Sequence, residues 1–191
     1  RLGILPTGQS YSLIVDYIGR TLGGVVAIDI GSAAGTLAAW LGGTLGTSIR
    51  TDIGLGHSAR NLLETVGVEA IRGWLPFYIS AEELTVYALD KTLRPVIGPE
   101  TLRDLYLEYA FLRAGIRAMI RASLAAWDKA LDDGADAILP PFDRVIGAGA
   151  AITETGRPGL SAMLLLDALA PEGIVTLYTD SIAHDDVTPI S

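Results

Sequence analysis

The stretch VVAIDIGSAAGTLAAWLGGTLGTSIRT, residues 25–51, decides the fold that the sequence predicts. Residues 25–30 are apolar and rich in β-branched side chains except at Asp29, a composition typical of a strand buried on both faces. Residues 36–41 and 44–51 flank Gly42-Gly43, a two-residue turn whose glycines tolerate positive φ. The stretch therefore predicts three successive strands, the last two of which form a hairpin.

Outside this stretch, apolar periodicity predicts a series of helices and two more strands. Helices are expected over residues 11–22, 58–66, 68–74, 80–91, 101–127 and 160–169, and strands over residues 142–146 and 173–178. Ser80 with Glu83 matches a capping box, and Thr101 precedes the longest helix as its cap. This order of elements predicts an α/β domain, with one mixed sheet covered by helices.

Composition narrows the classes of partner. The formal net charge of the 191 residues is −8, which argues against a nucleic-acid or anionic-membrane surface, because both need clustered Lys and Arg. The chain has no cysteine, which excludes disulfides and thiolate chemistry. Half of the residues are hydrophobic, which indicates that apolar surface meets a partner domain or a second copy.

Two further observations bear on location. Residues 30–49 carry no charge over the length of a membrane span, but their five glycines and many hydroxyl residues favour buried strands instead. The chain begins at Arg1 without a basic region followed by an apolar run. We therefore expect a cytoplasmic protein with no membrane partner, and a piece of a longer chain.

The first candidate for chemistry follows the strand at residues 25–30. Gly31 and Gly35 allow the backbone to bend so that its N–H groups face an anion. Asp29 lies at the end of a predicted buried strand, where burying its charge costs free energy unless an opposite charge compensates it. A hydrated Mg²⁺ would provide that charge. The alternative is a glycine-rich bend in which Asp29 caps nearby backbone groups.

The second candidate, residues 145–152, follows another predicted buried strand. Its small residues from Gly147 to Ala150 leave room for a flat ring to lie against the backbone. The alternative is a plain turn between strand and loop. If both candidates form one site, the bend at Asp29 and the loop at Gly147–Gly149 must leave the same edge of one sheet.

In this order along the chain, the two segments resemble the second lobe of actin-like ATPases, the superfamily of sugar kinases and heat-shock chaperones. More closely, the chain resembles the MutL family of glutamate mutase operons, at residues 26–32, 52–56, 72–76 and 158–173. The resemblance covers nearly the whole chain. It implies one actin-like, ribonuclease H-like lobe over residues 1–191, with a phosphate-loop segment at 23–51 and an adenosine segment at 142–179.

The resemblance also implies a chaperone-like ATPase that serves an adenosylcobalamin-dependent mutase, with ATP and Mg²⁺ as cofactors. Asp29 would support the metal through water, or orient the attacking water. The phosphates would contact Gly31, Ser32, Gly35 and Thr36. The adenosine would contact Gly147, Ala148, Gly149 and Ala150.

The chain departs from the family at two positions. Ala34 and Gly35 stand where members usually carry hydroxyl residues, and each lost hydrogen bond to a charged group costs roughly 1.5–3 kcal/mol. No second Asp-x-Gly unit precedes residue 25, so an N-terminal lobe is an expected partner, and binding by this chain alone should be millimolar or weaker. The alternatives are a scaffold or dimerisation module that does not hydrolyse ATP, and a small-molecule kinase.

Weaker signals have simpler interpretations. Gly54-Leu-Gly56 matches part of a dinucleotide-binding fingerprint, but it follows a hairpin strand, so we interpret it as a tight turn with Ser58 capping the next helix. His57 beside it has a structural role or faces the phosphate cleft. Arg113, Arg117 and Arg121 share one helix face, which we expect to be solvated and paired with acids elsewhere, with an acidic protein partner as the alternative.

Overall fold

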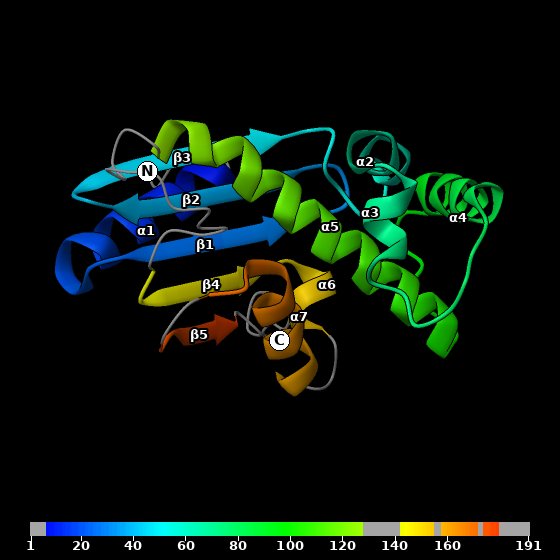
Figure 1. Ribbon diagram of the computed structural model, residues 1–191. Helices are drawn as coiled ribbons and strands as arrows, with labels where there is room; N and C mark the ends of the chain where they lie inside the picture. The colour runs from blue at the N-terminus through cyan, green and yellow to red at the C-terminus, as the bar shows by residue number, and fades with distance from the viewer. Residues whose placement is uncertain (1–6, 128–141, 155–157, 172–173, 180–191) are drawn as a thin grey trace, which may run out of the picture.

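A single mixed sheet organises the computed structural model, which describes residues 7–127, 142–154, 158–171 and 174–179. Its strands are β1 (Val25–Ile30), β2 (Gly35–Leu41), β3 (Thr44–Arg50), β4 (Arg144–Ala148) and β5 (Thr176–Thr179). The strand order is β3-β2-β1-β4-β5, as Figure 1 shows. Strand β2 is antiparallel to both of its neighbours, whereas β4 is parallel to β1 and to β5. The predicted α/β fold with a hairpin in a mixed sheet is confirmed.

Helices cover both faces of this sheet. They are α1 (Thr7–Leu22), α2 (Ala59–Val66), α3 (Val68–Arg72), α4 (Ala81–Leu93), α5 (Leu102–Trp127), α6 (Ala150–Thr153) and α7 (Pro158–Leu169). Helix α1 packs on one face, against β1, β2 and β3, and α5 crosses the other face (Figure 1). Helices α2, α3 and α4 gather beyond the end of the sheet at which β1 and β4 finish (Figure 1). That end therefore has both strand termini and a helical wall.

The apolar core follows the alternation of side chains along β1. Val26, Ile28 and Ile30 are buried in a large cluster on the α5 side. Val25 and Ala27 belong to a smaller cluster beneath α1. Successive side chains of a strand point to opposite faces, so a strand covered by helices on both sides is apolar at nearly every position.

Some predicted boundaries were wrong. The expected strand over residues 142–146 is β4 at Arg144–Ala148, because Gly147 and Ala148 continue the parallel pairing with β1 as partners of Ile28 and Asp29. Gly35 likewise belongs to β2, since it pairs with Ile30. The short helix α6 was not predicted, and the predicted strand over 173–178 is displaced to Thr176–Thr179.

Helix caps were predicted with mixed success. Ser80 and Glu83 form the expected capping box, and the Thr101 hydroxyl accepts from the Asp104 N–H at 3.1 Å. Ser58 makes no side-chain cap. Its Oγ instead lies 2.8 Å from the Ala33 carbonyl oxygen and 2.9 Å from that of Thr51. The hydroxyl of Ser58 therefore joins two loops and does not start a helix.

The uncharged residues 30–49 run mostly through β2 and β3, as predicted. Among the residues that the structure describes, no helix combines the length and the apolar character that crossing a bilayer would need.

Candidate functional site

The two glycine-rich segments predicted to act together lie side by side at the ends of β1 and β4. In the parallel pairing of these strands, Asp29 is the register partner of Ala148. Gly149 follows with φ of +90°, and a Cβ placed on it would lie 2.5 Å from Asp29 Oδ1 and 2.9 Å from the Ile30 carbonyl oxygen. The carboxyl ends of parallel strands meet at one edge, so this adjacency follows from the topology.

Asp29 is half-buried and has no counter-charge. No ion pair or hydrogen bond to its carboxylate is found among the described residues, and burial raises its pKa above the ordinary value of 3.8. Its side chain lies on the α1 face of β1, opposite to Ile28 and Ile30. Desolvation disfavours the charged form, so the carboxylate destabilises the fold at neutral pH unless a ligand compensates it.

This burial predicts a pH-dependent effect of Asp29→Asn. Because the folded-state pKa is raised, the stability that Asp29 contributes is present below pH 3.8 and lost as the pH rises through the folded pKa. We expect the variant to melt at a higher temperature than the parent at pH 7, with a difference that shrinks towards pH 3. Asp143→Asn, which makes the same change at an exposed carboxylate beside the start of β4, is the matched control. The quantity to compare is the melting temperature of the variant minus that of the parent. If this difference is smaller at pH 7 than at pH 3, the assignment is contradicted.

The bend after β1 is held by a second loop, residues 54–58, that is distant in the sequence. Backbone N–H groups of Leu55 and Gly56 donate to the carbonyl oxygens of Gly31 and Ser32, at 3.0 and 2.9 Å. The Ser58 N–H also donates to the Ser32 carbonyl, at 3.2 Å. These bonds fix the position of the bend relative to α2.

The glycines of the 54–58 loop are explained by this contact. A Cβ on Gly54 would lie 2.6 Å from the Ser32 carbonyl oxygen and 3.0 Å from the backbone nitrogen of Ala34. A Cβ on Gly56 would lie 2.1 Å from Ser32 Oγ and 2.8 Å from Pro95 Cβ. The resemblance to a dinucleotide fingerprint thus has a steric origin, the close approach of two loops.

His57 lies beside the predicted phosphate-binding residue Ser32. Ser32 Oγ is 2.9 Å from His57 Nδ1, and it accepts from the His57 backbone N–H at 3.2 Å. Both side chains are exposed. The imidazole therefore positions the Ser32 hydroxyl at the surface, where a ligand can reach it.

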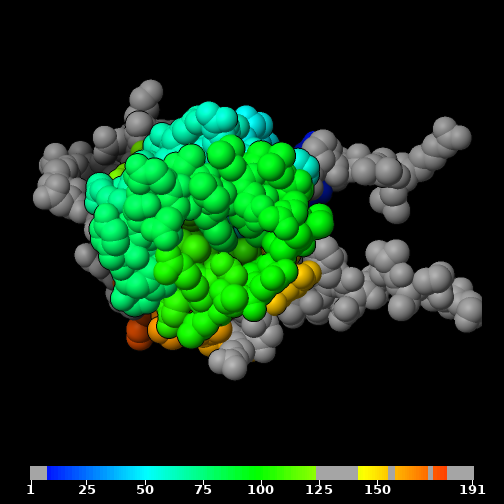
Figure 2. All heavy atoms as spheres, turned by 90° about the vertical axis from the view of Figure 1, so that its right-hand side faces the viewer, coloured from blue at the N-terminus to red at the C-terminus, as the bar shows by residue number. Residues whose placement is uncertain are grey.

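A cavity of about 560 Å³ opens next to these loops. It is lined by Gly31, Ser32 and Gly56 on one side, by Ala150 and Ala151 of α6 on another, and by residues 95–99 after α4. Figure 2 shows this end of the molecule, where the surface is hollowed between the green side chains of α4 and α5. Its size falls within the range of small-molecule sites.

The wall of this cavity contributed by α4 and α5 was not predicted. Lys91 Nζ lies 2.8 Å from Glu108 Oε2, with both side chains nearly buried, and it also donates to the Ile97 carbonyl at 2.8 Å. The Tyr109 hydroxyl is buried and has no hydrogen-bond partner among the described residues. One signal was present in the sequence: Glu108 falls within the apolar stripe of α5, where carboxylates are rare unless paired.

The predicted site residues divide into two groups. Gly31, Ser32 and Ala150 line the cavity, and the others do not. A Cβ on Gly35 would lie 2.5 Å from the Met119 sulfur, and one on Gly147 would lie 2.7 Å from Leu165 Cδ1. Thr36 and Ala148 are buried as well. Most of the second group is therefore buried, whereas Asp29 and Gly149 are half-buried.

No family model matches the chain, and no curated protein matches it.

Proposed function

We propose that this chain is a nucleotide-binding lobe of the actin-like ATPase fold. The observation that carries the proposal is the cavity of about 560 Å³ in which Gly31 and Ser32 meet Ala150, although 118 residues separate Ser32 from Ala150. The mixed sheet, with its hairpin first and its two parallel strands last, also matches what the resemblance implies.

Each side of the cavity suits one part of a nucleotide. The bend at Gly31 and Ser32 offers backbone and a hydroxyl for phosphate oxygens. The small residues Ala150 and Ala151, at the start of α6, leave space for a flat base. The Lys91–Glu108 pair supplies polar groups on the opposite wall. A few polar groups in a mainly apolar hollow are typical of cofactor sites.

Magnesium fits this arrangement only with the nucleotide. The described residues contain no group of three or more acidic or histidine side chains that would hold a metal by themselves. Mg²⁺ in nucleotide sites is commonly bound by one or two carboxylates together with phosphates and waters. Asp29, for which the described part of the chain offers no ion pair or hydrogen bond, would contact such an ion through water. The metal would neutralise negative charge on the phosphates.

Binding without hydrolysis is a second candidate that one observation favours. Gly35 packs against Met119 in the core, and Ala34 carries no hydroxyl, so neither position offers a side-chain donor to a phosphate. Such a lobe would act as a scaffold whose shape depends on the nucleotide. Measuring ATP hydrolysis by this chain together with an N-terminal lobe distinguishes the ATPase from the scaffold. Hydrolysis that Asp29→Ala abolishes supports the ATPase.

For the role of the whole protein, we propose the one that the MutL resemblance implies, a chaperone-like factor for an adenosylcobalamin-dependent mutase. Closure of two lobes around ATP, and reopening after hydrolysis, would change the surface presented to that client. The proposal rests on residues 26–32, 52–56, 72–76 and 158–173, which carry the resemblance.

Titration with Mg-ATP, followed by amide NMR, tests the binding site directly. We expect a dissociation constant of about 1 mM, because one lobe encloses the ligand on one side only. Signals of Gly31, Ser32, Gly56 and Ala150 should shift together. Mg-triphosphate without adenosine should shift the first three and leave Ala150 unchanged.

Ser32→Ala should weaken the binding of Mg-ATP by about threefold to tenfold, since it removes one hydroxyl near the phosphates. Ser12→Ala, which removes a hydroxyl that contacts Thr47 near α1, is the matched control and should bind like the parent. Shifts that map outside the cavity, or no shift with Mg-ATP at about ten times the expected dissociation constant, would exclude a nucleotide site here.

A further inference from the structure

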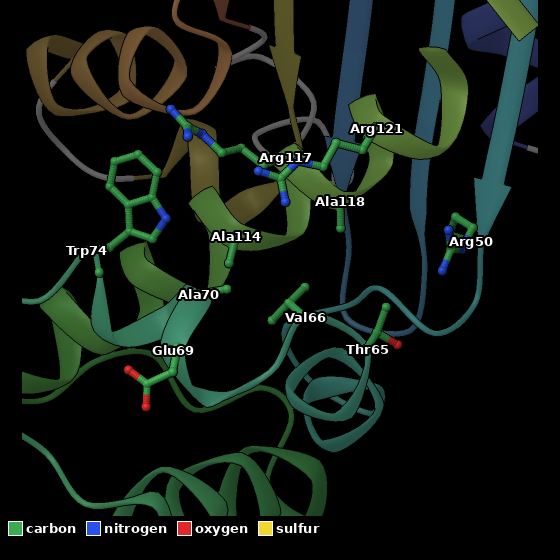
Figure 3. A pocket seen from close by; sticks show the side chains of 11 residues that line it. Arg50, Thr65, Val66, Glu69, Ala70, Trp74, Ala114, Arg117, Ala118 and Arg121 are labelled. Atoms are coloured by element: carbon green, nitrogen blue, oxygen red, sulfur yellow. The ribbon is translucent and has the colours of Figure 1, made fainter. Parts of the chain in front are cut away.

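A second cavity, also of about 560 Å³, lies where α5 crosses α2, α3 and the end of β3. Its floor consists of the small apolar side chains Val66, Ala70, Ala114 and Ala118. Figure 3 shows Arg50 and Thr65 on one side of this hollow and Trp74 on the other. The short side chains leave the hollow open, and the indole gives it an aromatic wall.

Three arginines line this cavity, and two of them have no carboxylate partner within the residues that the structure describes. Arg50 forms a two-point ion pair with Asp52. Arg117 donates to the backbone carbonyls of Asp167 and Ala168 at the end of α7, at 3.1 and 3.3 Å. Arg121 is exposed, and no ion pair to it is found among the described residues. The expectation of arginines paired with acids holds only for Arg113, which binds Asp167 at 2.7 Å.

The lining carries an excess of positive charge in an acidic protein. Its single carboxylate, Glu69, is already paired with Arg72 at 2.6 Å. The guanidinium of Arg117 lies 4.8 Å from the centre of the Trp74 ring, which holds that side chain in place. A concave patch lined by guanidinium groups attracts anions, and the guanidinium fork matches phosphate and carboxylate oxygens.

We propose that this second cavity binds the phosphate monoester of a small organic molecule. A phosphate monoester carries a charge of about −1.5 to −2 at pH 7 and three acceptor oxygens, which suits several guanidinium groups better than a single carboxylate does. The apolar floor at Ala114 and Ala118 and the indole of Trp74 accept the organic part. None of the residues that line the nucleotide cavity lines this one, so the site is separate.

Calorimetric titration of the chain with phenyl phosphate tests the proposal. Phenyl phosphate should bind more tightly than inorganic phosphate, and phenol should not bind measurably. Arg121→Gln should raise the dissociation constant for phenyl phosphate at least about tenfold, because it removes a charged hydrogen-bond donor from an exposed position. Ala118→Leu, which fills the floor with a helix-compatible side chain, should abolish binding while the thermal transition stays cooperative.

Arg60→Gln is the matched control. It removes the same charge from α2, outside the cavity, where Arg60 pairs with Glu64 at 2.8 Å. Its dissociation constant should stay within about twofold of the parent value at 0.15 M salt, because Arg60 does not line the cavity and its charge is already paired with Glu64. The proposal is overturned if Arg60→Gln weakens binding as much as Arg121→Gln does, if inorganic phosphate binds as tightly as phenyl phosphate, or if Ala118→Leu leaves binding intact.

Discussion

Gly149→Ala is expected to lower the free energy of unfolding by about 3 kcal/mol or more. Two costs combine: the residue has φ of +90° and ψ of 141°, where an L side chain is strained, and the new methyl group would lie 2.5 Å from Asp29 Oδ1. The nearby Ile30 carbonyl is backbone and has no rotamer by which to move away. For a chain of this size, the melting temperature should fall by roughly 6 to 12 °C.

The matched control is Gly159→Ala in α7. A Cβ at Gly159 meets nothing within 4 Å, and alanine is the better helix former. This variant should be as stable as the parent, or more stable by up to about 1 kcal/mol. Equal melting temperatures for the two variants would show that the β1–β4 edge relaxes easily. This result would contradict the close packing on which the candidate site depends.

The second large effect is expected from separating Lys91 and Glu108. The side chains are only 12% and 11% exposed, so Lys91→Met leaves a nearly buried carboxylate without its cation. Loss of one partner of a buried pair costs about 3–5 kcal/mol, and we expect the lower end because the pair borders a cavity. Chemical denaturation of Lys91→Met and of Glu108→Gln measures each cost.

A double change distinguishes pairing from ordinary packing. Lys91→Met combined with Glu108→Gln removes both charges, so the double variant should be more stable than the sum of the single effects predicts, by at least about 1 kcal/mol. Arg60→Met breaks the exposed Arg60–Glu64 pair and should cost less than about 1 kcal/mol. Additive single effects at Lys91 and Glu108 would mean that the ion pair contributes little to stability.

Much of the fold was predictable because its signals are local. The apolar, β-branched run at residues 25–30 and the Gly42-Gly43 turn predicted β1, β2 and β3, and the apolar repeat predicted α5. The end of β4 was misplaced because Gly147 has no strand propensity of its own. It extends the strand only because β1 lies beside it and offers a partner at Ile28.

The candidate site was predictable in part. Asp29 and the glycines were selected from local composition, and the structure places Asp29 beside Ala148 and Gly149. The Lys91–Glu108 pair and the arginine-lined cavity were not predicted. Both depend on which helices pack together: Lys91 on α4 meets Glu108 on α5, and the second cavity lies between α5 and the α2–α3 segment. The period of apolar residues in a helix shows which face is apolar, but not which helix that face contacts.

The sequence alone therefore determined the order and type of most elements, and the residues able to carry charge or bend the backbone. Tertiary structure decided what those residues do. Gly35 packs against Met119 in the core, and Gly54 lies in close contact with the backbone of Ser32. The physical reason is one of range. Periodicity, turns and caps act over a few residues, whereas burial and counter-charges depend on segments brought together only when the sheet forms.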